Sequence, residues 1–349
     1  MRKIKIGNKI IGGDNPAFVI AEAGCNHDCM LDRGKKLVEA AAKSGFDAIK
    51  FQNFKSEKLV TKTVPKFWVD DKKDKTQMSN YIGQDKLDRE SYRALARLAN
   101  KLGIIYLSTP FDEEEADFLE ELKVPAYKIA STDLTNLPFL KYVAKKGKPI
   151  LLSVGMGSIG EIEEAIEAVK STGNEEIVLL HCIVIYPTPP EQANLRFIKT
   201  LQNLFPEYPV GFSDHTLGIV IPAIAASLGA KVIEKHFTID KNMKGSPDHP
   251  MSVDPDEAKE MIQAIKVAEV CMGSPVRRLL EDEKKAYELG RRKIVANENI
   301  NKGTVIERNM IVCKRSEEGI APKFMDIIIG RRASRHIKMD EGISWEKIM

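Results

Sequence analysis

Short apolar segments alternate with longer amphipathic segments from about residue 17 to residue 272. This alternation limits the possible folds most strongly, because it is typical of βα units repeated around a parallel sheet. Eight segments have the length and composition of strands, at residues 17–24, 48–52, 104–110, 126–131, 149–155, 177–187, 209–215 and 231–238. Eight such repeats predict a closed (β/α)8 TIM barrel. The alternative is a doubly wound open sheet, but AEAGCNHD after the first strand is not a Gly-rich dinucleotide fingerprint.

The barrel pattern ends before the chain does. The charged segment RRLLEDEKKAYELGRR is typical of a linker, and short β-like runs separated by turn residues follow it. We therefore predict a barrel over residues 1–280, a linker over 281–290 and a small β-rich domain over 291–349. A domain of about 60 residues has a marginal core, so we expect it to dock on another part of the protein.

Residues 53–87 interrupt the rhythm of the barrel. The segment is long, rich in Lys and Asp, and contains Trp68, Met78 and Tyr81. Such a segment predicts an elaborated βα loop, which we interpret as a candidate lid over a pocket.

Composition narrows the class of protein. The 349 residues include 43% hydrophobic and 30% charged residues, and the formal net charge is +3. This balance argues against a partner that is nucleic acid or an anionic membrane. No apolar run approaches the roughly 20 residues of a bilayer span, and the first residues lack a signal-peptide pattern, so we expect a cytoplasmic protein. Five scattered cysteines predict reduced thiols, and Cys25, His27 and Cys29 lack the second pair that a structural zinc site needs.

Polar residues gather at the carboxyl ends of the predicted strands, where (β/α)8 barrels carry their active sites. The set is Glu22, Lys50, Gln52, Ser108, Thr109, Lys128, Ser131, Ser153, His181, Ser213, Asp214, His215, Glu234, Lys235 and His236. Each one has the alternative of being an internally satisfied polar residue. A buried charge is costly unless it is paired or coordinated, so the set as a whole predicts an active site.

Two of these residues, Lys50 and Lys128, predict an anion pocket. The hydroxyl groups that accompany them belong to Thr109, Ser131, Ser153 and Ser213. Two cations with several hydroxyl donors suit a phosphate that carries a neighbouring carboxylate. The alternative is that Lys128 forms a Schiff base, as the lysine of class I aldolases does.

Two histidines predict a metal site beside this pocket. His215 and His236 end neighbouring strands, and a pair of imidazoles with open positions fits a catalytic divalent metal. His181 lies inside an apolar run and has the alternative of lining the barrel wall. Asp248, in a stiff turn, is a candidate to bind sugar hydroxyls, and Tyr186 is either a wall aromatic or a hydroxyl contact.

Several motifs together resemble the sialic acid synthase family, which includes N-acetylneuraminate, legionaminate, pseudaminate and related spore-coat synthases. They are AEAGCNH, IKFQ, LSTPF, YKIAS, LLSVGM, LLHC with YPTPP, GFSDHTLG, EKHFT and GSPDH. The similarity runs nearly end to end. It implies a TIM barrel followed by an antifreeze-like (SAF) domain, and a domain-swapped homodimer in which the small domain caps the partner's barrel.

The resemblance also implies a reaction and residue roles. Phosphoenolpyruvate would condense with N-acetylmannosamine or a related 6-deoxy diacetamido hexose to give a nonulosonic acid and phosphate. His215 and His236 would bind Mn2+, with Mg2+ or Co2+ as alternatives, and Glu22 would manage the proton or stabilise the cationic centre. The residues implied to hold phosphoenolpyruvate are Lys50, Thr109, Lys128, Ser131, Ser153 and Ser213. Those implied to contact the sugar are Gln52, Asp133, Tyr186, Asp248 and, across the dimer, Arg315.

Two departures from the family pattern concern the identity of the sugar. Ile183 and Val184 stand where sialic-acid-making members carry a polar pair, and Asp133 stands where some members have Glu.

Two other functions stay open. One is a different phosphoenolpyruvate-dependent keto-deoxy sugar acid synthase with a phosphorylated acceptor, which predicts a further basic cluster at the barrel mouth. The other is a catalytically silent carbohydrate-binding barrel.

Overall fold

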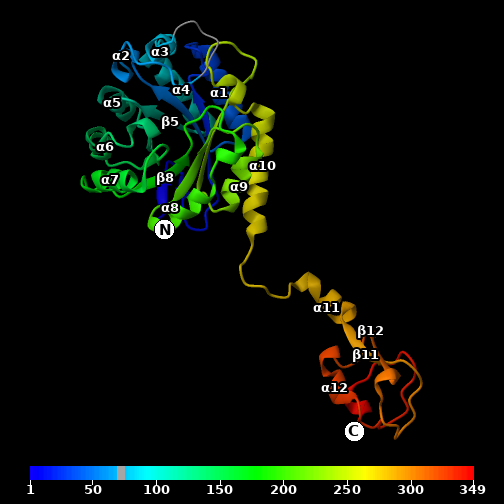
Figure 1. Ribbon diagram of the computed structural model, residues 1–349. Helices are drawn as coiled ribbons and strands as arrows, with labels where there is room; N and C mark the ends of the chain where they lie inside the picture. Colours follow the sequence, from blue (N-terminus) through cyan, green and yellow to red (C-terminus); the bar gives the residue numbers. More distant parts are fainter. Residues whose placement is uncertain (69–74) are drawn as a thin grey trace. The chain divides into compact units, whose positions relative to one another are not determined.

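The computed structural model describes residues 1–68 and 75–349. The chain divides into two compact units, Met1–Gly273 and Ser274–Met349, and each is described by itself (Figure 1).

The first unit is built on a ring of eight parallel strands. They are β3 (Phe18–Gly24), β4 (Ala48–Asn53), β5 (Ile105–Pro110), β6 (Tyr127–Ile129), β7 (Ile150–Ser153), β8 (Ile177–Cys182), β9 (Val210–Asp214) and β10 (Val232–His236). Their order is β5-β4-β3-β10-β9-β8-β7-β6, and β5 and β6 pack together where the ring closes. The predicted TIM barrel is confirmed, and the doubly wound alternative is wrong because β10 pairs with β3.

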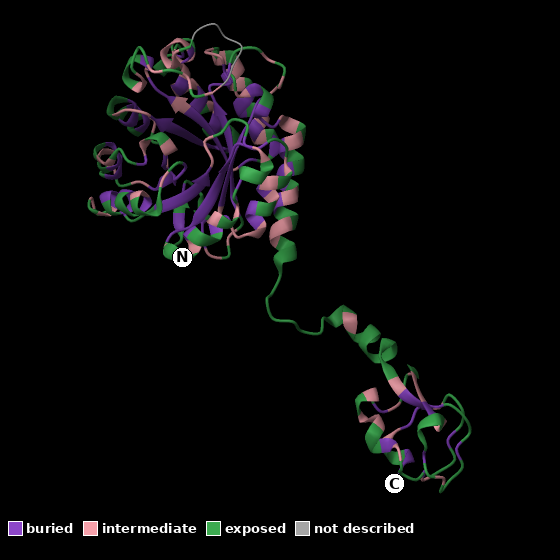
Figure 2. Cartoon of the chain, viewed as in Figure 1, coloured by how far each residue is buried: buried purple, intermediate pink, exposed green. Residues whose placement is uncertain are grey.

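Helices surround the strands, whose residues are mostly buried (Figure 2). The helices are α1 (Leu31–Ser44), α2 (Ser56–Leu59), α3 (Gln77–Tyr81), α4 (Arg89–Leu102), α5 (Glu113–Glu121), α6 (Leu137–Ala144), α7 (Ile159–Lys170), α8 (Arg196–Leu204), α9 (Val220–Ser227) and α10 (Pro255–Met272). Short 3-10 turns lie at η1 (Ser131–Asp133), η2 (Pro190–Gln192) and η3 (His249–Met251). Among the described helices, none has the length and apolar character needed to cross a membrane.

The ends of two barrel helices follow from capping residues. Helix α4 ends at Gly103, whose φ of 76° is the left-handed conformation that favours glycine. Helix α10 begins with Pro255, and the Asp254 side chain accepts hydrogen bonds from the backbone N–H groups of Asp256 and Glu257. Gly103 and Asp254 therefore act as helix caps.

A hairpin closes the amino end of the barrel. It consists of β1 (Ile4–Ile6) and β2 (Lys9–Ile11), and three of its four isoleucines, those at 4, 6 and 11, join the buried residues inside the ring. Burial of an aliphatic side chain of this size contributes about 1.5–3 kcal/mol to stability. The three buried side chains therefore stabilise the packing of the hairpin against the barrel. The cavity of the barrel lies at the opposite end, where the strands have their carboxyl termini.

The second unit has an antiparallel pair of strands and a small core of its own. Its elements are η4 (Glu281–Glu283), α11 (Lys284–Gly290), β11 (Arg292–Ala296), η5 (Arg308–Met310), β12 (Ile311–Arg315), η6 (Pro322–Phe324), α12 (Met325–Ile328) and η7 (Trp345–Lys347). Its buried hydrophobic residues are mostly isoleucines. The segment predicted as a linker, residues 281–290, contains the turn η4 and the helix α11.

Candidate active site

A cavity of about 370 Å³ lies at the carboxyl ends of the barrel strands. The predicted site residues that line it are Glu22, Lys50, Gln52, Thr109, Lys128, Ser131, Ser153, Tyr186, Ser213, His215, His236 and Asp248. They come from every strand of the ring or from the segment that directly follows one. The barrel thus brings together side chains that lie more than 200 positions apart in the sequence.

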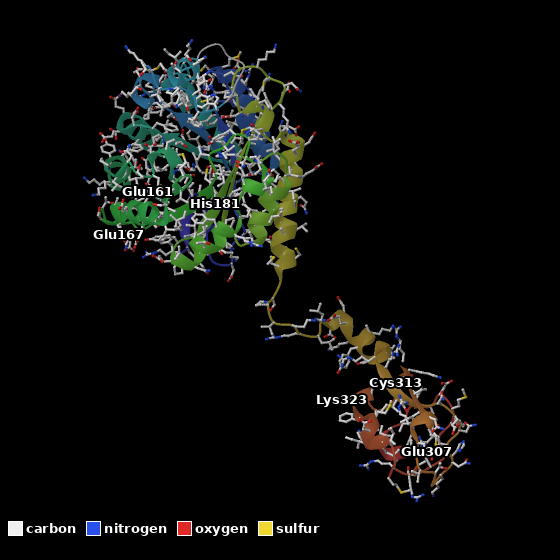
Figure 3. The ribbon with its side chains drawn as sticks, in the orientation of Figure 1. Glu161, Glu167, His181, Glu307, Cys313 and Lys323 are labelled. Carbon is white, nitrogen blue, oxygen red and sulfur yellow. The ribbon has the colours of Figure 1, made fainter. Side chains whose placement is uncertain are left out.

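Some residues predicted for the site have other positions. Ser108, Asp214 and Lys235 are not among the residues that line the cavity, and neither are Asp133, Arg315 and His181. Asp133 ends the turn η1, and its carboxylate accepts a hydrogen bond from Asn136 Nδ2 at 3.1 Å. Arg315 is the exposed last residue of β12, in the second unit. His181 Nε2 lies 2.8 Å from the Ala193 carbonyl, with its ring beside two phenylalanines, so this histidine belongs to the barrel wall (Figure 3).

Two lysines and two glutamates form a buried charge cluster at the base of the cavity. Lys50 Nζ lies 2.5 Å from Glu22 Oε2 and 3.7 Å from Glu234 Oε2, and Lys128 Nζ lies 3.6 Å from Glu234 Oε1. All four side chains are at most 5% exposed, and their formal charges cancel. Sequence reasoning placed Glu234 among the strand-end polar residues but gave it no role. The signal was a carboxylate inside the apolar strand β10, which needed a cationic partner.

The two carboxyl groups have opposite pKa shifts. Burial raises the pKa of Glu22 above its ordinary value, although Lys50 opposes the shift. Burial alone would also raise the pKa of Glu234, but Lys128 and Lys50 outweigh it and the pKa is lowered. Neighbouring groups whose environments drive their pKa values apart are typical of acid–base pairs. The lowered pKa favours a charged Glu234, and the raised pKa makes Glu22 the carboxyl group better suited to gaining and losing a proton.

Hydroxyl groups surround this charge cluster. Lys50 donates to Thr109 Oγ1 at 3.2 Å, and Ser213 donates to Glu234 Oε1 at 2.9 Å. Ser131 Oγ accepts from the Gly155 backbone N–H at 3.0 Å. Ser153 Oγ is buried and makes no hydrogen bond within the described residues. A buried polar group without a partner costs about 1–3 kcal/mol, so the Ser153 hydroxyl is suited to a ligand.

The two predicted metal ligands meet at the rim of the cavity. The ring centroids of His215 and His236 are 5.4 Å apart, and the Tyr186 ring lies 4.1 Å from that of His215. His215 Nδ1 lies 2.7 Å from the Ile183 carbonyl oxygen. Because a carbonyl only accepts, Nδ1 carries a proton, and in the neutral ring Nε2 has the lone pair that a metal requires. Burial alone would lower the pKa of His215, but Cys182 and the Ile183 carbonyl outweigh it and the pKa is raised.

His236 is also held in the form that binds metals. Burial, with a smaller effect of neighbouring cationic groups, keeps the pKa of His236 well below its ordinary value, so the ring is neutral. Its Nδ1 makes no hydrogen bond within the described residues and lies 3.6 Å from Asp248 Oδ2. Over residues 1–68 and 75–349, no group of three His, Cys, Asp or Glu side chains is arranged to share an ion. A divalent metal held by the two histidines would keep open positions for substrate.

Apolar side chains also line the cavity, and we refer to them together as the apolar wall. They are Leu59, Val60, Phe67, Trp68, Tyr81, Phe111 and Val184. Most of these residues belong to the candidate lid, residues 53–87, of which 69–74 lie outside the described residues. The cavity is thus lined both by buried charges and by apolar and aromatic side chains.

Fold and site together define a (β/α)8-barrel protein whose cavity joins a paired-lysine cluster to a paired-histidine site. The chain belongs to the NeuB family. Residues 37–277 match the profile of that family, and residues 291–349 match the SAF domain.

Similar proteins match along almost the whole chain. The N,N'-diacetyllegionaminic acid synthase of Legionella pneumophila is 40% identical, over 99% of this chain and 98% of that protein. The human N-acetylneuraminate-9-phosphate synthase is 35% identical, over 97% of this chain and 94% of that protein. The crystal structure of N-acetylneuraminic acid (sialic acid) synthetase from Leptospira borgpetersenii, in complex with citrate, superposes with a TM-score of 0.74 at 33% identity. That match covers 82% of this chain and 95% of the Leptospira chain.

Proposed function

We propose that this protein is a nonulosonic acid synthase that joins phosphoenolpyruvate to an N-acylated amino sugar aldehyde and releases phosphate. The observation that carries the proposal is that His215 and His236 line the same cavity as Lys50 and Lys128. The printed names of the relatives, which are synthases of legionaminic and neuraminic acids, support the same class.

The charge cluster would hold phosphoenolpyruvate. Lys50 and Lys128 would bind its carboxylate and phosphate, joined by the hydroxyls of Thr109, Ser131, Ser153 and Ser213. Support comes from the Ser153 hydroxyl, which is buried without a partner among the described residues. The anionic ligand would compete with Glu22 for Lys50, so its binding would make the Glu22 carboxylate a stronger base.

The histidines would hold the metal and the acceptor would bind beside them. When bound, Mn2+, with Mg2+ or Co2+ as alternatives, would supply Lewis acidity to the aldehyde oxygen of the sugar. Gln52, Tyr186 and Asp248 would orient the sugar through its hydroxyl and amide groups.

In the reaction, C3 of phosphoenolpyruvate forms a bond to the aldehyde carbon, which leaves a cationic C2. Water adds to C2, and the C2–O bond to phosphate then breaks. The Glu22 carboxylate accepts one proton as this water adds, and passes it to the former aldehyde oxygen, which becomes a hydroxyl. As the C2–O bond breaks, the remaining proton of the added water moves from the C2 hydroxyl to the leaving phosphate, so C2 becomes a ketone and the protons balance. The raised pKa of Glu22 supports its role as that base.

We propose a neutral acceptor such as a 6-deoxy diacetamido hexose, with N-acetylmannosamine as the alternative. The apolar wall suits acyl and deoxy methyl groups, since such groups gain most from burial against aromatic and aliphatic surfaces. The lysines that line the described cavity, Lys50 and Lys128, are both paired with carboxylates. A phosphorylated acceptor would need a further cation, which makes the keto-deoxy sugar acid synthase the weaker alternative.

The remaining parts of the proposal concern assembly and location. A domain-swapped homodimer would let the SAF domain of one subunit act on the barrel of the other, with Arg315 contacting the N-acyl group of the sugar. Arg315 is exposed and ends a strand, which supports an intermolecular role. We also propose a cytoplasmic location.

The test is phosphate release from phosphoenolpyruvate with Mn2+ and a panel of hexosamine aldehydes. Release that depends on a neutral N-acylated aldehyde is the expected result. Release only with a phosphorylated sugar that has no N-acyl group would favour the keto-deoxy sugar acid synthase. If phosphoenolpyruvate bound in calorimetry but no aldehyde caused release, the catalytically silent barrel would be favoured instead.

A further inference from the structure

Asp28 lies outside the cavity and yet makes the main contacts of a turn that lines it. It follows β3 in the loop before α1, and its backbone has a φ of 44°, in the left-handed region that Asp tolerates better than most residues. Oδ1 accepts from the Ser246 backbone N–H at 2.7 Å, and Oδ2 pairs with His249 Nε2 at 3.1 Å and with the Arg33 guanidinium. One carboxylate thus accepts from two donors of the turn at 245–249 and from Arg33 of helix α1.

The two residues that Asp28 contacts in the turn stand on either side of Asp248. Ser246 precedes it by two positions, and His249 follows it directly. At Gly245 the turn passes so close to Asp28 that an added Cβ would collide with the carboxylate, and the φ of 143° there also favours glycine. The path of the turn is therefore fitted to the Asp28 side chain.

His249 connects the same network to the end of β10. The ring is fully buried, and its Nδ1 lies 2.8 Å from Thr238 Oγ1, two residues after His236. With Nε2–H donating to the Asp28 carboxylate, Nδ1 accepts from the Thr238 hydroxyl, which defines one tautomer of a neutral ring. Asp248 itself is fixed by its carbonyl, which accepts from Ser252 Oγ at 2.6 Å.

We propose that Asp28 is a positioning residue, which holds the turn at 245–249 so that the Asp248 carboxylate faces the acceptor sugar. The proposal rests on the proposed function, in which Asp248 binds that sugar. Asp28 acts on the acceptor only through Asp248, so it should affect the acceptor and not phosphoenolpyruvate, whose lysines lie on other strands. Misplacement of a binding group by about 1 Å is enough to change rates up to about 100-fold.

The test compares Asp28→Gly with Asp28→Asn. Glycine suits the left-handed backbone and removes the carboxylate. Asparagine still accepts from the Ser246 N–H and contacts His249 through the other ring tautomer. The KM for the acceptor should rise roughly 10- to 100-fold in Asp28→Gly and clearly less in Asp28→Asn, with the KM for phosphoenolpyruvate changed less than about two-fold. Asp32→Gly is the matched control, because Asp32 is exposed and pairs only locally with Lys35 among its described contacts.

A double variant tests whether Asp28 acts through Asp248. If it does, Asp28→Gly adds little to the acceptor KM of Asp248→Ala, because the two changes remove one interaction. An unchanged acceptor KM in Asp28→Gly, equal effects on both substrates, or effects of Asp28→Gly and Asp248→Ala that multiply would each overturn the proposal.

Hydrogen exchange separates this inference from the proposed function. In Asp28→Gly, amide exchange over residues 244–251 should be faster than in the wild type and in Asp32→Gly, whether or not the protein makes a sugar acid. Unchanged exchange would overturn the positioning role. If the wild type were inactive but amide exchange still became faster in Asp28→Gly, the proposed function would be contradicted. The role of Asp28 in positioning the turn would still be supported.

Discussion

Lys235 Nζ lies 2.7 Å from Asp214 Oδ2, in an ion pair with both side chains fully buried, and the residue after each partner is a histidine of the candidate metal site. The two residues are directly opposite each other on β10 and β9. Asp214 Oδ1 also accepts from the Thr216 backbone N–H, and Lys235 donates to the Thr216 carbonyl. The pair thus fixes the chain on both sides of His215 and just before His236.

This ion pair leads to a prediction about stability. Lys235→Met leaves the Asp214 charge buried without its cation, and we expect a loss of about 3–5 kcal/mol in the free energy of unfolding. The double variant Lys235→Met/Asp214→Leu buries no charge, so most of that loss should be recovered. Urea denaturation measures the free energy of unfolding of the single and the double variant. A double variant as unstable as the single one would contradict the account.

Glu22 is expected to affect turnover and not binding. Glu22→Gln keeps a side chain of the same size that can still pair with Gln52, which donates to Glu22 Oε1 at 2.7 Å. Because the amide cannot accept a proton from water, kcat should fall by about 10²–10⁴-fold. Mn2+ content and the affinity for phosphoenolpyruvate should be retained, and exposed Glu39→Gln on α1 serves as the control. Full turnover with unchanged metal content would remove Glu22 from the mechanism.

Much of the fold, but less of the site, was predictable from sequence. The strands of the barrel are apolar and regularly spaced, so periodicity alone located them. The hairpin β1–β2 was missed because three-residue strands carry no measurable period. The role of Glu234 depends on Lys50 and Lys128, which meet it only when the ring closes. The position of Asp133 depends on the turn η1, in which Ser131 and Thr132 line the cavity and Asp133, at the end of the turn, does not.

Replacing Ser153 should weaken the binding of phosphoenolpyruvate and hardly change the stability of the ligand-free protein. Since its buried hydroxyl has no partner among the described residues, Ser153→Ala should leave the stability of the ligand-free protein unchanged or slightly higher. A hydrogen bond to a charged ligand contributes about 1.5–3 kcal/mol, so the KM for phosphoenolpyruvate should rise at least about 10-fold. Thermal unfolding and steady-state kinetics check the two halves. A stability loss with an unchanged KM would show that the hydroxyl serves the fold.

His27 should make the protein sensitive to acid. The ring is fully buried, accepts at Nδ1 from the Cys29 backbone N–H at 2.9 Å, and lies beside Phe51 and Tyr92. Burial, with a smaller effect of Arg33, lowers the pKa of His27 from 6.5 to about 4. The unfolded chain therefore gains this proton first, and stability present above pH 6.5 is lost as the pH falls towards 4.

The free energy that His27 contributes follows from the difference between its pKa values in the unfolded and the folded protein. At about 1.36 kcal/mol per pKa unit, it contributes on the order of 3 kcal/mol. In His27→Leu, the free energy of unfolding should therefore fall less between pH 7 and pH 4 than in the wild type. Parallel pH profiles of the two proteins in urea denaturation would contradict the assignment.

The central claim is that this cavity forms a carbon–carbon bond and then breaks the C2–O bond of phosphoenolpyruvate. The most direct measurement uses phosphoenolpyruvate with ¹⁸O in the bridging position, together with Mn2+ and an N-acylated amino sugar aldehyde, followed by mass spectrometry of both products. We predict a sugar acid with the mass of the acceptor plus a pyruvyl unit, and the ¹⁸O label in the released phosphate. Label retained in the organic product, or phosphate released without such a sugar acid, would contradict the account.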